Sequence, residues 1–239
     1  MTRTLPLALL APLAIAAAAS PAAAAAAERR YSVTDFDRVQ VDGPYRVTLR
    51  TGLASGATAE GSQQALDHVS VEVQGGILRV RRNRSAWGGY PGEAAGPVTV
   101  ALTTRDLRSA AVIGSGSLEV DKVRGLRADL SVSGSGRLGV AAVDADNLIV
   151  GLLGGGRITL AGRARQLRAT IQGSGDLAAS GLRAEDAQIT SDTAGNVAVA
   201  AARTARVTAT GPGDVEIIGT PSCTVEAKGL GQVRCGRGR

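Results

Sequence analysis

A glycine motif recurs along the second half of this 239-residue chain at nearly constant intervals. Copies of the form Gly-x-Gly occupy residues 114–116, 134–136, 154–156 and 173–175, and altered copies occupy 193–195, 211–213 and 229–231. The last residues of successive copies are 20, 20, 19, 20, 18 and 18 positions apart. A fixed period of this length is typical of repeat architectures, in which each unit packs mainly against its neighbours.

Apolar and polar residues alternate on both sides of each glycine motif. At positions 2, 4 and 6 before it and 2 and 4 after it, 33 of 35 residues are Ala, Val, Leu, Ile or Cys, the exceptions being Arg108 and Ser191. A period of two indicates strands with one buried face. One copy cannot bury its apolar row alone, so we expect stacking at about 4.8 Å. The sequence therefore predicts an all-β parallel β-helix, or β-solenoid, with about seven Gly-x-Gly rungs of 18–20 residues.

One copy completes the pattern G-x-G-x-x-G, between Gly134 and Gly139. A dinucleotide-binding loop needs a helix that begins at such glycines. No amphipathic helical pattern follows Gly139. We therefore interpret the motif as a turn, where glycine allows a positive φ, and we expect no cofactor.

Residues 28–105 do not follow the repeat, although they have strand-like patterns. Two pairs of such segments flank Gly43-Pro44 and Gly75-Gly76, and each pair predicts a β-hairpin. We expect an irregular β cap with a loop at residues 83–97, followed by solenoid repeats over 106–239. No helix-length periodic segment remains, and residues 28–239 are expected to form one continuous domain.

The first 27 residues have the pattern of a cleaved secretory signal. Arg3 precedes an apolar stretch, residues 5–19, and a segment rich in alanine, residues 20–27. The apolar stretch is shorter than the roughly 20 residues that a membrane helix needs. We predict a periplasmic or secreted protein without a transmembrane segment in its mature chain. The net charge of +6 is spread along the sequence rather than gathered in blocks, so no nucleic-acid partner is expected.

Three segments together resemble a known family. They are "FDRVQVDGPYRVTLRTG" at residues 36–52, "LRSAAVIGSGSLEV" at 107–120 and "CTVEAKGLGQVRCG" at 223–236. With the successive G-S-G rungs between them, they look like the putative auto-transporter adhesin head GIN domain. The resemblance implies a β-helical protein of the cell envelope, and it supplies no catalytic residues.

Cys223 and Cys235 are the only cysteines, and both fall on inward positions of the last copy. An oxidising compartment permits a disulfide between them, with two buried free thiols as the alternative. His68 is the only histidine and has no partner residue in a catalytic motif. We predict no metal site, since two sulfurs alone make a poor one.

Outward carboxylates offer one enzymatic hypothesis. Asp176, Asn196 and Asp214 share one repeat position, and Glu216 follows two residues after Asp214. Stacking places these carboxylates about 7–10 Å apart, near the separation found in inverting glycosidases. A carbohydrate-active enzyme is therefore an alternative, although a solvated polar face is the simpler interpretation.

Other outward residues are candidates for binding. Arg137 and Arg157 stack in adjacent copies, and an anion, or neighbours such as Asp129, could relieve their repulsion. Ile113, Ile149 and Leu153 break the alternation and indicate an apolar patch, which either the chain's own loop or a partner covers. Trp87 and Tyr90, in the loop, are candidate anchors for a ligand.

These patterns favour a secreted or periplasmic, non-enzymatic β-solenoid that acts as an adhesin-like binding or structural module of the cell envelope. The sequence does not identify its ligand. The candidate partners are a glycan, another envelope component or a second copy of the chain. Two alternatives stay open. One is the carbohydrate-active enzyme, and the other is a homo-oligomeric scaffold assembled through the Ile113, Ile149 and Leu153 face.

Overall fold

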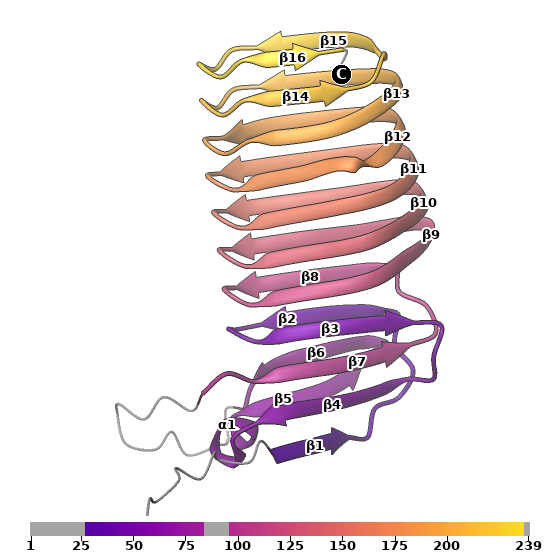
Figure 1. Ribbon diagram of the computed structural model, residues 1–239, viewed down its shortest axis with the longest axis vertical. Coiled ribbons are helices and arrows are strands. Elements are labelled where there is room, and N and C mark those ends of the chain that lie inside the picture. Colours follow the sequence, from indigo (N-terminus) through magenta and orange to yellow (C-terminus); the bar gives the residue numbers. More distant parts are fainter. Residues whose placement is uncertain (1–26, 84–95, 237–239) are drawn as a thin grey trace, which may run out of the picture.

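The structure is a computed structural model that describes residues 27–83 and 96–236, and Figure 1 shows it as a tall stack of β-coils. The described elements in chain order are β1 (Ala27–Tyr31), β2 (Arg38–Asp42), β3 (Arg46–Thr51), β4 (Gly56–Gly61), α1 (Gln63–Asp67), β5 (Val69–Gln74), β6 (Ile77–Arg82), β7 (Thr99–Thr104), β8 (Ser109–Gly114), β9 (Ser117–Gly134), β10 (Arg137–Gly154), β11 (Arg157–Gly173), β12 (Asp176–Thr193), β13 (Val197–Ala209), β14 (Val215–Ile218), β15 (Ser222–Ala227) and β16 (Val233–Cys235). The predicted β-solenoid is confirmed.

The long strands β9 to β12 each run from one glycine corner to the next and so form one turn of the solenoid. Neighbouring turns pair in parallel, with Leu138 opposite Leu118 and Ile158, and Ile158 opposite Leu177. All four side chains are buried, as the alternation predicts. The stack has about six turns, a minor difference from the seven rungs expected.

Each turn has two faces, joined by a sharp glycine corner and by a curved edge (left and right in Figure 1). The pre-corner face consists of β2, β6, β8, β15 and the parts of β9 to β13 that lead into a corner. The post-corner face consists of β3, β7, β14, β16 and the parts that follow a corner. The core between these faces consists almost entirely of Val, Leu, Ile and Ala.

The two glycines of a corner have partly different roles, as the second corner illustrates. Gly134 has a φ of +114°, in the left-handed region that favours glycine. A Cβ added to Gly136 would lie 2.7 Å from the carbonyl oxygen of Gly116 and 2.6 Å from a methyl carbon of Val112. The first glycine thus allows the chain to turn. Both glycines allow adjacent turns to approach at the strand spacing, since a Cβ on Gly134 would lie 2.6 Å from Gly114 O.

We predict that Gly136→Ala lowers the free energy of unfolding by about 1–3 kcal/mol, because the added methyl group overpacks the corner. Gly151→Ala is the matched control, since its Cβ would meet nothing closer than 3.9 Å and its φ lies outside the left-handed region. Urea denaturation measures both variants. Equal stability of the two would contradict the role assigned to Gly136.

The N-terminal region contains more regular solenoid structure than the sequence analysis expected. β2 pairs in parallel with β8 and β6, and β3 pairs in parallel with β9 and β7. The predicted hairpin at Gly43-Pro44 is therefore wrong, since β2 and β3 lie on opposite faces of one coil. Gly43 donates its N–H to Ile113 O (3.0 Å), which places this turn directly below the first Gly-x-Gly corner.

Antiparallel strands close the N-terminal end of the stack. β5 and β6 form the hairpin predicted at Gly75-Gly76, whose two residues have φ values of +59° and +73°. β4 pairs antiparallel with β7, and β1 pairs antiparallel with β4. A short helix that the sequence analysis did not anticipate, α1, begins after Ser62, whose side chain accepts the Ala65 N–H. Among the described residues no helix is long and apolar enough to cross a membrane.

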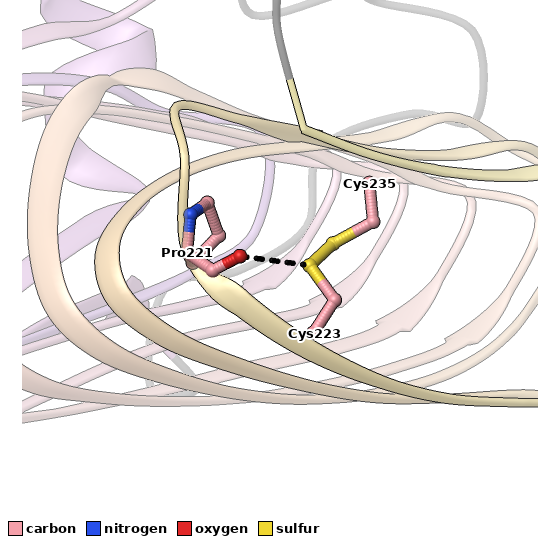
Figure 2. The surroundings of a disulfide bond; sticks show 3 residues. All are labelled: Pro221, Cys223 and Cys235. Carbon is pink, nitrogen blue, oxygen red and sulfur yellow. Dashed lines mark hydrogen bonds between the residues drawn. A yellow bond between two sulfur atoms is a disulfide. The ribbon is translucent and has the colours of Figure 1, made fainter.

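A disulfide joins the two faces at the C-terminal end of the stack (Figure 2). Cys223 lies on β15, in register with Ala205, and Cys235 lies on β16, in register with Ile217. Their Cα atoms are 6.5 Å apart, and Cys223 Sγ lies 3.7 Å from Pro221 O. Within the described residues no strand lies above β15, and 42% of the surface of Val225 is exposed. The disulfide thus joins the two faces at the last turn of the described residues.

We predict that the Cys223→Ser/Cys235→Ser double variant loses roughly 2–3 kcal/mol of unfolding free energy, as expected for a bond that closes a short loop. Hydrogen exchange should rise in β14 to β16, while β9 to β11 should keep their protection. Cys223→Ser/Cys235→Ser is compared with the native protein at the same temperature and pH. Unchanged protection in β15 would contradict a stabilising role.

Candidate functional site

An elongated groove of about 620 Å³ runs along the pre-corner face beside the curved edge. We call it the arginine groove. Its lining residues are Arg127, Asn147, Leu148, Ile149, Gln166, Leu167, Arg168, Asp186, Ala187, Gln188, Thr204, Ala205, Arg206, Ser222 and Thr224. They belong to six successive strands, β9 to β13 and β15, so the groove is about 24 Å long at a strand spacing of about 4.8 Å.

The repeat arranges the groove's side chains in two columns. The first column consists of the residues seven positions before each glycine motif: Arg127, Asn147, Gln166, Asp186, Thr204 and Ser222. The second consists of those five positions before it: Ile149, Arg168, Gln188, Arg206 and Thr224, with Asp129 of β9 continuing the column just beyond the lining. Between the columns lie buried residues such as Leu148 and Leu167, whose side chains point into the core. Parallel register therefore builds a straight, mostly polar channel from alternate residues of each strand.

Arginines of the groove differ in whether a carboxylate neutralises them. Arg127 forms an ion pair with Asp129 (3.1 Å). Arg168 instead donates a hydrogen bond to the amide oxygen of Gln188 (3.1 Å). Among the described residues, neither Arg168 nor Arg206 forms an ion pair with a carboxylate. These two guanidinium groups can therefore bind an anion without first breaking a salt bridge.

The acidic residue that lines the groove is already engaged. Asp186 accepts a hydrogen bond from the hydroxyl of Thr204 (2.7 Å) and pairs with Arg203. Both interactions hold the pKa of Asp186 below its ordinary value. Its charge is thus compensated locally, which leaves the positive charges of Arg168 and Arg206 to dominate the middle of the groove.

Similar ion pairs between turns account for many other arginines. Arg163 pairs with Asp144 (2.8 Å) and Arg165 with Asp146 (3.5 Å) along the curved edge. Each pair joins side chains from adjacent turns. Such exposed pairs contribute little stability individually, but they relieve the repulsion that stacked like charges would cause.

The carboxylates of the enzymatic hypothesis have structural partners. Asp176 accepts the backbone N–H of Asn196 (3.0 Å) and a hydrogen bond from Arg157 (2.7 Å). These two interactions lower the pKa of Asp176, the backbone hydrogen bond most strongly. Asp214, which lies two turns above Asp176, likewise accepts the backbone N–H of Gln232 (2.9 Å). A general acid needs a raised pKa at neutral pH, so this geometry disfavours Asp176 as the general acid.

We predict that Asp176→Asn destabilises the protein most at neutral pH. Because the folded-state pKa is lowered, the carboxylate stabilises the fold above its unfolded pKa, and this effect disappears as the pH falls through the folded value. Urea midpoints of native and variant protein should therefore differ at about pH 7 and converge toward about pH 3. Asp192→Asn, at an exposed position of the other face, is the control. A pH-independent difference would contradict this account.

Arg137 and Arg157 do stack in adjacent turns, on the post-corner face. The suggestion that Asp129 relieves their repulsion is wrong, since Asp129 lies on the pre-corner face and pairs with Arg127. Asp176, in the turn above, neutralises Arg157 instead (2.7 Å). The two arginines border a smaller hollow of about 290 Å³ between the side chains of Glu119 and Thr159.

The predicted apolar patch is fragmented. Ile113 and Leu153 are 39% and 56% exposed, but Ser133 lies between them in the same column. Ile149 is half-buried and lines the arginine groove. The patch therefore offers little continuous apolar area for a scaffold interface. Trp87 and Tyr90 lie outside the described residues, as does the predicted signal segment up to residue 26.

No metal centre is formed by the described residues. Within residues 27–83 and 96–236, no three His, Cys, Asp or Glu side chains gather closely enough to hold a metal ion. His68 follows α1, where its backbone N–H donates to Ala65 O (3.2 Å). It lies beside a hollow that also contacts Tyr45, whose pKa is raised by burial.

The sequence analysis did not single out the residues that form the arginine groove, except Ile149. Arg168, Gln188 and Arg206 share one repeat position, so an alignment of the copies would have placed them in one column. The alignment alone would not have indicated a hollow. That hollow is lined by residues of six strands, which the alignment does not place in space.

Comparisons with known proteins agree with the fold. The family described as "Putative auto-transporter adhesin, head GIN domain" matches residues 35–221. A putative adhesin from Bacteroides fragilis NCTC 9343 is 18% identical, with a TM-score of 0.80 over 90% of this chain and 98% of that chain. A putative lipid binding protein from Parabacteroides distasonis ATCC 8503 is 19% identical, with a TM-score of 0.70 over 89% and 97% of the two chains. No curated protein sequence matches this chain significantly.

Proposed function

Since this chain belongs to the family of putative auto-transporter adhesin head GIN domains, we propose that it is an exported, non-enzymatic binding module of the cell envelope. Its adhesin-like character follows from the family and from the β-solenoid fold that it shares with structures named as putative adhesins. The finer parts of the proposal, which are export, envelope location and the lack of catalysis, rest on the following observations.

The arginine groove is the observation that carries the proposal. It is open to solvent, crosses six strands and has polar side chains in fixed columns. Those strands are held in register by backbone hydrogen bonds to neighbouring turns, so the groove is preorganised. A preorganised surface avoids much of the ordering cost that binding otherwise incurs.

Three outward carboxylates are poorly suited to donate a proton, which supports a non-enzymatic role. The pKa values of Asp144, Asp176 and Asp186 are all lowered by hydrogen bonds and ion pairs. Each of these carboxylates is therefore held ionised by its neighbours. This is the opposite of what proton donation to a leaving group requires.

Export is supported by two independent features. Residues 1–27 have the charge and hydropathy pattern of a secretory signal. Cys223 and Cys235 form a disulfide, a bond that is typical of oxidising compartments such as the periplasm or the exterior. Both features favour a location outside the cytoplasm.

We predict that the purified protein binds isolated cell envelopes saturably and releases no reducing sugar from them. Fluorescently labelled protein is titrated onto washed envelopes, and reducing ends are assayed in the same samples. An unrelated exported protein of similar net charge is the control for non-specific attachment. Binding no better than this control, or sugar release that Asp176→Asn abolishes, would contradict the proposal.

A further inference from the structure

We propose that the arginine groove binds an extended acidic polysaccharide, whose chain runs along the stack and whose carboxylates pair with Arg168 and Arg206. The inference rests on the proposed binding function and adds the chemical class of the ligand. It follows from the shape of the groove, the spacing of its charges and the composition of its lining.

The groove has the shape of a site for a linear polymer. It is straight, because its two columns follow the parallel register of β9 to β13 and β15. Equivalent positions recur at about 4.8 Å along its length of about 24 Å. A small ligand would occupy only one or two of these positions, whereas an extended chain of repeating units can contact all of them.

The charges of the groove recur on alternate turns. Arg168 lies on β11 and Arg206 on β13, with Gln188 of β12 between them in the same column. The two arginines are therefore about 9.6 Å apart along the stack, twice the strand spacing. In an extended polysaccharide, this is close to the length of two sugar rings. A chain with a carboxylate on every second sugar thus matches the arginines, and guanidinium groups bind carboxylates through paired hydrogen bonds.

The remaining polar side chains suit sugar hydroxyl groups. Gln166 and Gln188 offer amide groups, and Thr204, Ser222 and Thr224 offer hydroxyls, all of which can donate and accept hydrogen bonds. Because Arg168 donates to the Gln188 amide oxygen, the amide nitrogen of Gln188 is left to donate to a ligand.

The composition of the lining also distinguishes between polyanions. Among residues 27–83 and 96–236, no aromatic side chain lines the groove. Single-stranded nucleic acids bind largely by stacking their bases on aromatic residues, so this lining favours a ligand that is recognised through carboxylates and hydroxyls. The engaged Asp186 and the Arg127–Asp129 pair add no uncompensated negative charge that would repel it.

The test compares four polymers in binding titrations with the purified protein at low ionic strength. They are hyaluronate, in which uronate alternates with a neutral sugar, polygalacturonate, neutral dextran and single-stranded DNA. We expect both polyuronates to bind, with weaker binding as salt is added, and dextran not to bind. Arg168→Gln/Arg206→Gln should lower polyuronate affinity at least about tenfold, since it removes two charge-assisted contacts.

Arg46→Gln/Arg50→Gln is the matched control, because it makes the same change of charge at exposed positions of β3 on the opposite face. We expect it to retain polyuronate affinity within about twofold, and circular dichroism confirms that both variants are folded. Equal losses in the two variants, tighter binding of DNA than of either polyuronate, or no polyuronate binding by native protein would overturn the inference.

The same variants separate this inference from the proposed function. If native protein and Arg168→Gln/Arg206→Gln attach equally well to cell envelopes, the groove is not the attachment site, although the binding module stands. If polyuronates bind through the groove but envelopes do not bind, the ligand class stands and the envelope function fails.

Discussion

The parallel hydrogen-bond ladder between successive turns sets the distance at which every part of this molecule must pack. At that spacing, the corners bring the backbone of one turn against the backbone of the next, and Gly136 lies where a side chain would collide with the Gly116 carbonyl. Glycine therefore recurs because of a contact between turns and not only because of the bend within one. The same spacing aligns Leu138, Ile158 and Leu177 in a continuous core that needs almost no aromatic residues.

The ladder also determines how the surface is built. Because equivalent residues of adjacent turns lie side by side, a charge in one turn faces whatever occupies its position in the next. Arg157 meets Asp176, and Arg163 meets Asp144, so most of the stacked charge is balanced. Where the next residue is an amide instead, as at Arg168 and Gln188, a positive charge stays available to an outside partner. The proposed binding surface is therefore the place where arginines lack the carboxylate partners that they have in adjacent turns elsewhere on the solenoid.

The sequence predicted what depends on period and alternation. Local patterns predicted the β-solenoid and the inward row that contains Leu138 and Ile158. They also predicted the Gly75-Gly76 hairpin and the position of both cysteines at one end. The Gly43-Pro44 turn was misinterpreted, because a strand, a glycine and a second strand describe a hairpin and a solenoid corner equally well. Only contacts with a distant segment, such as Gly43 with Ile113, distinguish the two. The arginine groove was missed for a related reason, since its lining comes from six strands that are distant in the sequence.

The two ends of the stack differ, with antiparallel strands at the N-terminal end (Figure 1) and the Cys223–Cys235 bond at the C-terminal end (Figure 2). The turns between them, such as those of β10 and β11, contact only their neighbours and share the same inward columns. Removing or duplicating one such turn would leave the structure of both ends intact. The remaining turns would still form their parallel backbone hydrogen bonds. The architecture therefore does not fix the number of turns. Gene duplication within the repeat could lengthen the surface without changing either end of the stack.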